Sequence, residues 1–139
     1  MKLSRYGEVQ SYLKLLSGSA LNDHLSYSFN FDHFSVDNNI IESLKNHIRN
    51  VYLANKSADF HFVLNEELEW QTVLSVSLGE FDLNEEYLSR FLSLFEDFIE
   101  NNTLRVWQIT SDLFWGVYQK ELLFKVENMY YYLLMYITD

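Results

Sequence analysis

Two hydrophobic periods succeed each other along this chain and restrict the folds open to it. Residues 25–32 alternate strictly between apolar and polar side chains, which is the period of a strand with one buried face. Residues 84–100 instead carry apolar side chains at helical spacing, and Asn84 is suited to cap that helix. The alternation of both periods predicts an α+β protein, in which helices pack on a sheet.

The remaining elements follow from the same patterns. Helical spacing predicts helices over 4–17, over 37–54 with Asp37 as N-cap, and over 120–137. Strand patterns predict a hairpin of 59–64 with 70–78 and a further strand over 104–110. Residues 111–119 stay open between a helix capped by Ser111, which Gly116 would weaken, and a hairpin partner of 104–110. We expect one α+β domain over 1–139, with an antiparallel or mixed sheet of about four to five strands and about four helices packed mainly on one face.

The composition supports a packed core. The 139 residues are 48% hydrophobic and 17% aromatic, whereas disordered chains lack the apolar area that offsets ordering entropy. There is no cysteine, which excludes disulfides and thiolate metal sites. No secretory signal is recognisable, and the longest apolar run has nine residues, against about 20 for a membrane-spanning helix. We expect a soluble cytoplasmic protein that does not insert into membranes.

The charges are segregated along the chain. Residues 1–64 carry six acids and six bases, whereas residues 65–139 carry fourteen acids and four bases, which accounts for the whole net charge of −10. Within 66–100 there are ten acids and one base, Arg90. A field of one sign attracts partners of the opposite charge and raises association rates. We therefore expect a basic protein partner, with a merely solvated surface as the alternative.

The acidic stretch supplies the candidate binding residues. If loop 65–69 and the start of the 84–100 helix lie on the same side, their carboxylates form one patch, and a second lobe lies roughly 15 Å further along the helix. Trp70 and Tyr87 are candidate aromatic anchors, because interface energy concentrates in a few aromatic and charged residues. The predicted partner-binding residues are Glu66, Glu67, Glu69, Trp70, Asp82, Glu85, Glu86, Tyr87, Glu96, Asp97 and Glu100.

No motif names a reaction. The four histidines lack metal-ligand spacing, and the pairs Asp23–His24 and Asp32–His33 place adjacent side chains on opposite faces of a strand. A G-x-S-x-G turn, a glycine-rich phosphate loop and a calcium-loop spacing are absent from the sequence. We expect no catalytic residue, no metal and no cofactor, although a carboxylate pair for glycoside chemistry stays open among the acids.

Direct binding of nucleic acid is disfavoured, because neutralising phosphates needs a basic surface. A protein that mimics DNA toward a DNA-binding protein stays open as an alternative.

The C-terminal run from Met129 to Ile137 is apolar almost all round, which predicts a buried core helix. The alternative is that Tyr131, Tyr132 and Met135 on this helix form a homodimer or adaptor interface.

In general character the chain resembles bacterial toxin-immunity proteins, of the contact-dependent growth inhibition or colicin type. The resemblance rests on the acidic stretch 66–100 and on the small, aromatic-rich, cysteine-free α+β domain. It implies a non-enzymatic protein that neutralises a cognate toxin domain, most readily a basic nuclease, by covering its active or substrate-binding surface.

Overall fold

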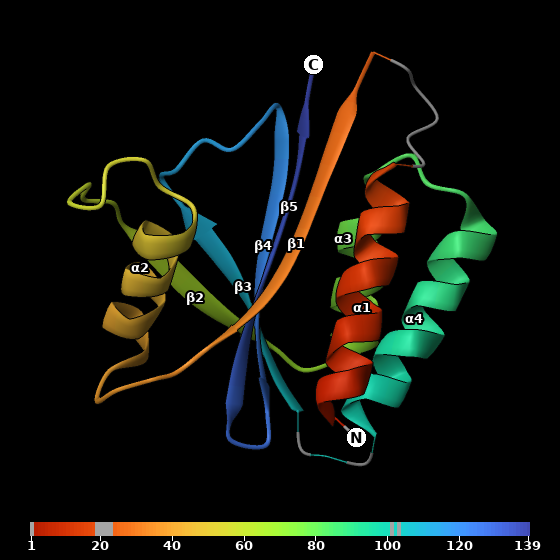
Figure 1. Ribbon diagram of the computed structural model, residues 1–139, viewed down its shortest axis with the longest axis horizontal. Coiled ribbons are helices and arrows are strands. Elements are labelled where there is room, and N and C mark those ends of the chain that lie inside the picture. Colours follow the sequence, from red (N-terminus) through yellow and green to blue (C-terminus); the bar gives the residue numbers. More distant parts are fainter. Residues whose placement is uncertain (1, 19–23, 101, 103) are drawn as a thin grey trace.

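Five antiparallel strands form one sheet in the order β1-β5-β4-β3-β2, shown with the helices in the computed structural model of Figure 1. The structure describes residues 2–18, 24–100, 102 and 104–139. The strands are β1 (Ser26–Phe34), β2 (Phe62–Glu67), β3 (Leu104–Ser111), β4 (Tyr118–Val126) and β5 (Met129–Thr138). The helices are α1 (Lys2–Ser17), α2 (Ile40–Val51), α3 (Trp70–Gly79) and α4 (Glu85–Ile99). The predicted α+β class is confirmed.

Helices cover both faces of the sheet. α1, α3 and α4 pack on one face around a core that includes Phe31, Phe95 and Phe124. Of the described helices, α2 alone packs on the other face, where Leu44, Ile48 and Tyr132 are buried. Figure 1 shows α2 on one side of the strands and the three other helices on the opposite side. Packing mainly on one face therefore describes three of the four helices.

The prediction of a C-terminal helix is wrong, because residues 120–137 form the β4–β5 hairpin. Val126 pairs with Met129, and Glu127 in the turn has a positive φ of 55°. β5 lies between β1 and β4, so both faces of the strand are buried and its side chains are apolar on both. The helical surface proposed for a homodimer does not exist, since Tyr131, Tyr132 and Met135 are buried in the sheet.

The prediction of a strand over 70–78 is also wrong, because this segment is α3. Its buried residues are Val73, Leu74, Ser77 and Leu78, which lie on one side of a helix. The partner of β2 is instead β3, with Leu64 opposite Ile109. Residues 112–117 form the loop between β3 and β4, which makes β4 the hairpin partner of the 104–110 strand.

One predicted cap is confirmed and one is wrong. The Asn84 Oδ1 atom accepts the backbone N–H of Glu86 at 2.9 Å, so Asn84 begins α4 as predicted. α2 is capped by Asn39 and not by Asp37, because the Asn39 Oδ1 atom accepts the N–H of Ile41 at 2.8 Å. None of the described helices has the length and apolarity to cross a bilayer.

Candidate functional site

The packing of α3 against α4 decides which acidic residues lie together. The ring of Trp70, at the start of α3, lies 5.3 Å from the ring of Phe95, near the end of α4. The two helices are therefore antiparallel, and the β2–α3 connection lies at the same end of the helical layer as the C-terminus of α4 (Figure 1). The α3–α4 connection lies at the opposite end, one α3 length of roughly 15 Å away.

The acids of 66–100 consequently form two groups rather than the patch expected. The group at the β2–α3 end, called group A here, consists of Glu67, Glu69, Glu96, Asp97 and Glu100. Glu66 lies beside this group but on the α2 face of the sheet, opposite Trp107. The group at the α3–α4 end, called group B, consists of Glu80, Asp82, Glu85 and Glu86. The residues expected to share one patch are thus divided between A and B, and the expected second lobe of Glu96, Asp97 and Glu100 belongs with Glu69.

Group A is largely exposed, and arginines pair with Glu100 within it and with Glu66 beside it. All its members are exposed except Glu67, which is half-buried. Glu66 forms a bidentate pair with Arg105 at 2.7 and 2.9 Å, and Arg5 contacts the Glu100 carboxylate at 2.7 Å. The Arg105 guanidinium holds the pKa of the Glu66 carboxyl below its usual value. Among the described side chains, Glu67, Glu69, Glu96 and Asp97 have no basic partner. Glu69, Glu96 and Asp97 are exposed, so the field of these three carboxylates extends into solvent.

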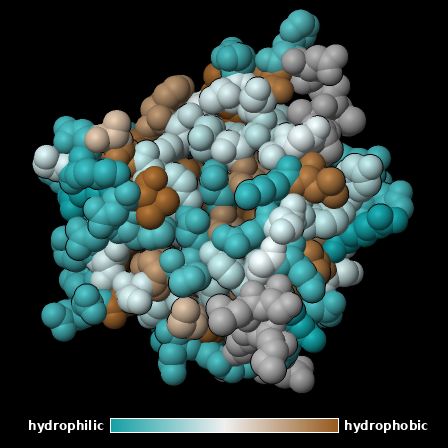
Figure 2. Space-filling model, viewed as in Figure 1, coloured by the Kyte–Doolittle hydropathy of each residue, from teal (hydrophilic) through white to brown (hydrophobic). Residues whose placement is uncertain are grey.

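Group B carries less charge. Glu86 forms an i,i+4 pair with Arg90 at 2.8 Å, and Glu85 and Glu86 lie in the first turn of α4, where the helix dipole favours negative charge. Hydrophilic residues cover most of the surface over α2 and α4 in Figure 2, and hydrophobic residues show there only as separate spots. The surface visible in this view is therefore mainly hydrophilic.

The two proposed aromatic anchors lie partly in the core and partly at the surface. Trp70 and Tyr87 are half-buried and pack against the core under α1, α3 and α4. The backbone oxygen of Tyr87 accepts the Tyr12 hydroxyl at 3.1 Å. The apolar residue that group A does present is Leu68, which is 96% exposed between Glu67 and Glu69. A leucine within a run of glutamates is the sequence signal that could have indicated this exposed residue.

A buried acid under α2 was also missed. Glu121 of β4 is buried, and its carboxylate accepts the hydroxyls of Tyr132 at 2.6 Å and Ser111 at 2.8 Å. Burial raises the pKa of the Glu121 carboxyl, and these two hydrogen bonds oppose the rise. Burial and the neighbouring Glu121 carboxylate raise the pKa of Tyr132 well above its usual value. The predicted helix over 120–137 concealed this pair, because it placed residues 121 and 132 on a helix rather than on neighbouring strands.

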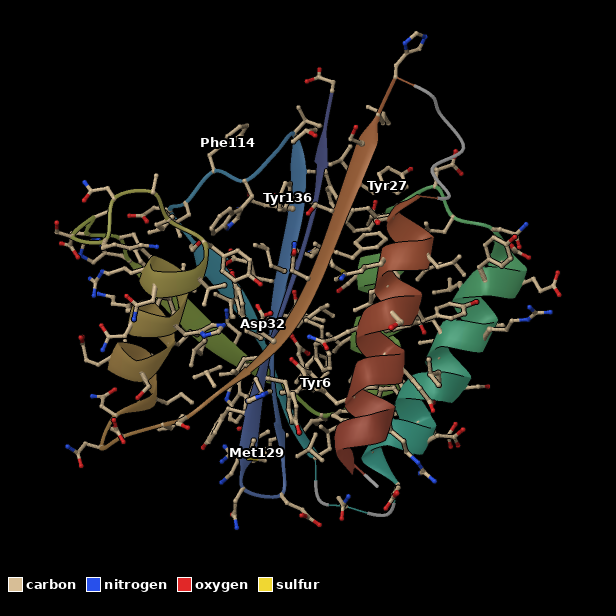
Figure 3. The ribbon with its side chains drawn as sticks, viewed as in Figure 1. Tyr6, Tyr27, Asp32, Phe114, Met129 and Tyr136 are labelled. Carbon is tan, nitrogen blue, oxygen red and sulfur yellow. The ribbon has the colours of Figure 1, made fainter. Side chains whose placement is uncertain are left out.

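A second polar cluster lies beside Glu121 and joins α2 to β1. Asp32 lies at the centre of β1 in Figure 3 and accepts the hydroxyl of Tyr52. The His47 Nε2 atom lies 3.6 Å from the Asp32 carboxylate and has no hydrogen-bond partner among the described residues. Asp32 thus faces His47 from another element, and not its sequence neighbour His33.

The second cluster borders a surface pocket of about 450 Å³ whose lining includes Phe34, Asp37 and His47. Within the described part of the chain, no three histidine, aspartate or glutamate side chains converge as metal ligands would. The hydrogen bond from Tyr52, the C-cap residue of α2, to Asp32 of β1 joins this helix to the sheet. Exposed carboxylates are concentrated elsewhere, in group A.

Comparison of the chain with protein-family models, curated proteins and solved structures found no match.

Proposed function

We propose that this chain is a non-enzymatic binding protein that neutralises a basic protein partner through group A. The observation that carries the proposal is the gathering of five acids at one end of the helical layer, four of them without a basic partner among the described side chains. Like charges held together repel one another, so their segregation is unfavourable for the free protein. A basic partner relieves that repulsion on binding.

The partner that fits is a cognate bacterial toxin domain of nuclease type. A nuclease binds phosphates through basic side chains, and an acidic surface competes for the same side chains. Group A would cover the active or substrate-binding surface of such a toxin without any reaction of its own. The absence of cysteine fits the reducing cytoplasm, where an immunity protein of this kind would meet its toxin.

Capture from the native cell tests the proposal. Three baits are compared: the wild type, the group A variant Glu69→Lys/Glu96→Lys/Asp97→Lys and the group B variant Glu80→Lys/Asp82→Lys/Glu85→Lys. Both variants have the same net charge, so they separate the position of the charges from their number. We expect one stoichiometric basic protein on the wild type and on the group B variant, and its loss from the group A variant and at high salt.

Two results would contradict the proposal. Equal loss from both variants would mean that overall charge alone attracts basic proteins. Capture of no basic protein by the wild type at low salt would refute the proposed partner class. Growth of cells that express the captured protein, with and without this chain, then distinguishes neutralisation from binding alone.

A further inference from the structure

The two edge strands of the sheet, β1 and β2, differ in the hydrogen bonds that side chains make to their outer backbone groups. At the β1 edge, the Tyr6 hydroxyl of α1 contacts the backbone oxygen of Phe31 at 3.1 Å and the backbone N–H of His33 at 3.2 Å. The Gln10 side chain donates to the same Phe31 oxygen at 2.8 Å. Figure 3 shows Tyr6 between α1 and the sheet. Side chains of α1 therefore occupy outer backbone groups of β1 at Phe31 and His33.

The β2 edge has no such cover. Among the described residues, the backbone groups of Phe62–Glu67 have hydrogen-bond partners only on the β3 side. Val63 is 60% exposed and Asn65 is exposed, so α3 does not cover this strand on its own side of the sheet. An uncovered edge of this kind is a template for the addition of a further strand.

The open edge runs directly into group A. Glu66 and Glu67 end β2 on opposite faces of the sheet, and Leu68 and Glu69 follow them. A strand added beside β2 would thus have carboxylates near it on both faces. Lys or Arg side chains on that strand would form ion pairs with them. Unlike charges at neighbouring positions on paired strands stabilise a sheet, and like charges destabilise it.

We propose that the free edge of β2 accepts an extended, lysine- or arginine-bearing segment of the basic partner as a sixth strand. The inference rests on the proposed function and adds to it the mode of binding. The charge argues against a second copy of this chain as the occupant, since pairing of two β2 edges would bring two copies of Glu66, Glu67 and Glu69 together in chains that each carry a net charge of −10.

Synthetic peptides test the strand addition. The probe is a ten-residue peptide that alternates lysine with valine. The first control is the same peptide with every second backbone nitrogen methylated, which keeps the charge but removes the donors that a sheet needs. The second control replaces lysine with glutamate. Backbone amide NMR shifts and amide exchange of the full chain report where each peptide binds.

We expect the lysine peptide to shift the amides of β2 and to slow the exchange of those on its outer edge. Backbone methylation should weaken binding at least tenfold, the glutamate peptide should not bind, and Glu69→Lys should weaken binding more than the group B substitution Glu85→Lys. Formation of a β2–β2 dimer of the chain in place of peptide binding would overturn the proposal.

Two further results would overturn it. Equal binding of the methylated peptide, with shifts confined to α3 and α4, would refute the added strand while leaving a basic partner for group A intact. Absence of lysine-peptide binding at low salt would refute the strand addition as well. The capture experiment with the group A and group B variants tests the proposed function independently of these peptide experiments.

Discussion

Trp70 and Phe95 pack with ring centroids 5.3 Å apart and so fix the start of α3 beside the end of α4. This contact makes the helices antiparallel and brings Glu69 to the end of the layer that holds Glu96, Asp97 and Glu100. Residues far apart in the sequence thereby share one field, whereas Glu69 and Asp82 are separated by the length of α3. The account of function depends on this arrangement.

The hydroxyl of Tyr132 should contribute measurably to stability. It donates to the buried carboxyl group of Glu121 at 2.6 Å, and leaving a buried acceptor without its donor costs about 1–3 kcal/mol. We expect Tyr132→Phe to lower the free energy of unfolding in urea by that amount. Tyr130→Phe, two residues earlier in β5, is the control and should change the free energy of unfolding by less than about 0.5 kcal/mol. Equal effects of the two substitutions would contradict the assignment.

The raised pKa of Glu121 predicts a stability difference that depends on pH. Because the pKa of this carboxyl is higher in the folded than in the unfolded protein, its contribution to stability is fully present below the unfolded pKa and is lost as the pH rises through the folded pKa. Each unit of difference corresponds to about 1.4 kcal/mol. Glu121→Gln, which does not titrate, should therefore gain stability relative to the wild type as the pH rises from about 4, near the unfolded pKa of a glutamate.

Urea unfolding of both proteins across this pH range measures the difference. Exposed acids titrate alike in the two proteins, so they cancel in the comparison. A difference that stays constant with pH, or that falls as the pH rises, would show that the folded-state pKa of Glu121 is not raised.

Gly116 should not tolerate alanine. A Cβ atom at this position would collide with the carbonyl oxygen of Ile137, whose hydrogen bond with the N–H of Val117 at 2.9 Å fixes the β3–β4 loop on β5. We expect Gly116→Ala to cost about 1–3 kcal/mol, as overpacking does. Gly79→Ala, where a Cβ would meet open space at the end of α3, should be neutral or stabilising by up to about 1 kcal/mol. Similar thermal unfolding of both variants would refute the close approach.

Tyr6 should protect the β1 edge. Its hydroxyl contacts both the Phe31 oxygen and the His33 N–H, and a net hydrogen bond is worth about 0.5–1.5 kcal/mol. We expect Tyr6→Phe to lose about that much stability and to speed amide exchange at His33, while the amides of β2 keep their rates. Unchanged exchange at His33 would show that water replaces the hydroxyl without loss.

The α+β class could be predicted from the sequence because most elements show one clear period. The exceptions have physical reasons. In α3 the apolar and β-branched residues fit both periods, and packing against α4 and the sheet selects the helix: Trp70, Val73, Leu74 and Leu78 form one stripe. In β5 both faces are buried, so the strand lacks alternation and cannot be told from a buried helix by its pattern.

The acidic surface was only partly predictable for the same reason. The segregation of charge is visible in the sequence, and the exposed positions of most candidate acids agree with it. The division of these acids into two groups depends on the direction of α3. It could not be inferred while residues 70–78 were predicted as a strand. The Glu121–Tyr132 and Asp32–His47 contacts join different strands and helices, and they needed the sheet order before either could be inferred.

The association rate of the captured partner with the three charge forms tests the central claim most directly. At about 20 mM salt, where the Debye length is long, the account predicts that the group A triple variant associates at least tenfold more slowly than the wild type. The group B triple variant, with the same net charge, should keep a rate within about threefold of the wild type, and the difference should shrink at about 300 mM salt. Equal slowing of the two variants, or no slowing of the group A variant, would contradict the claim that group A is the binding surface.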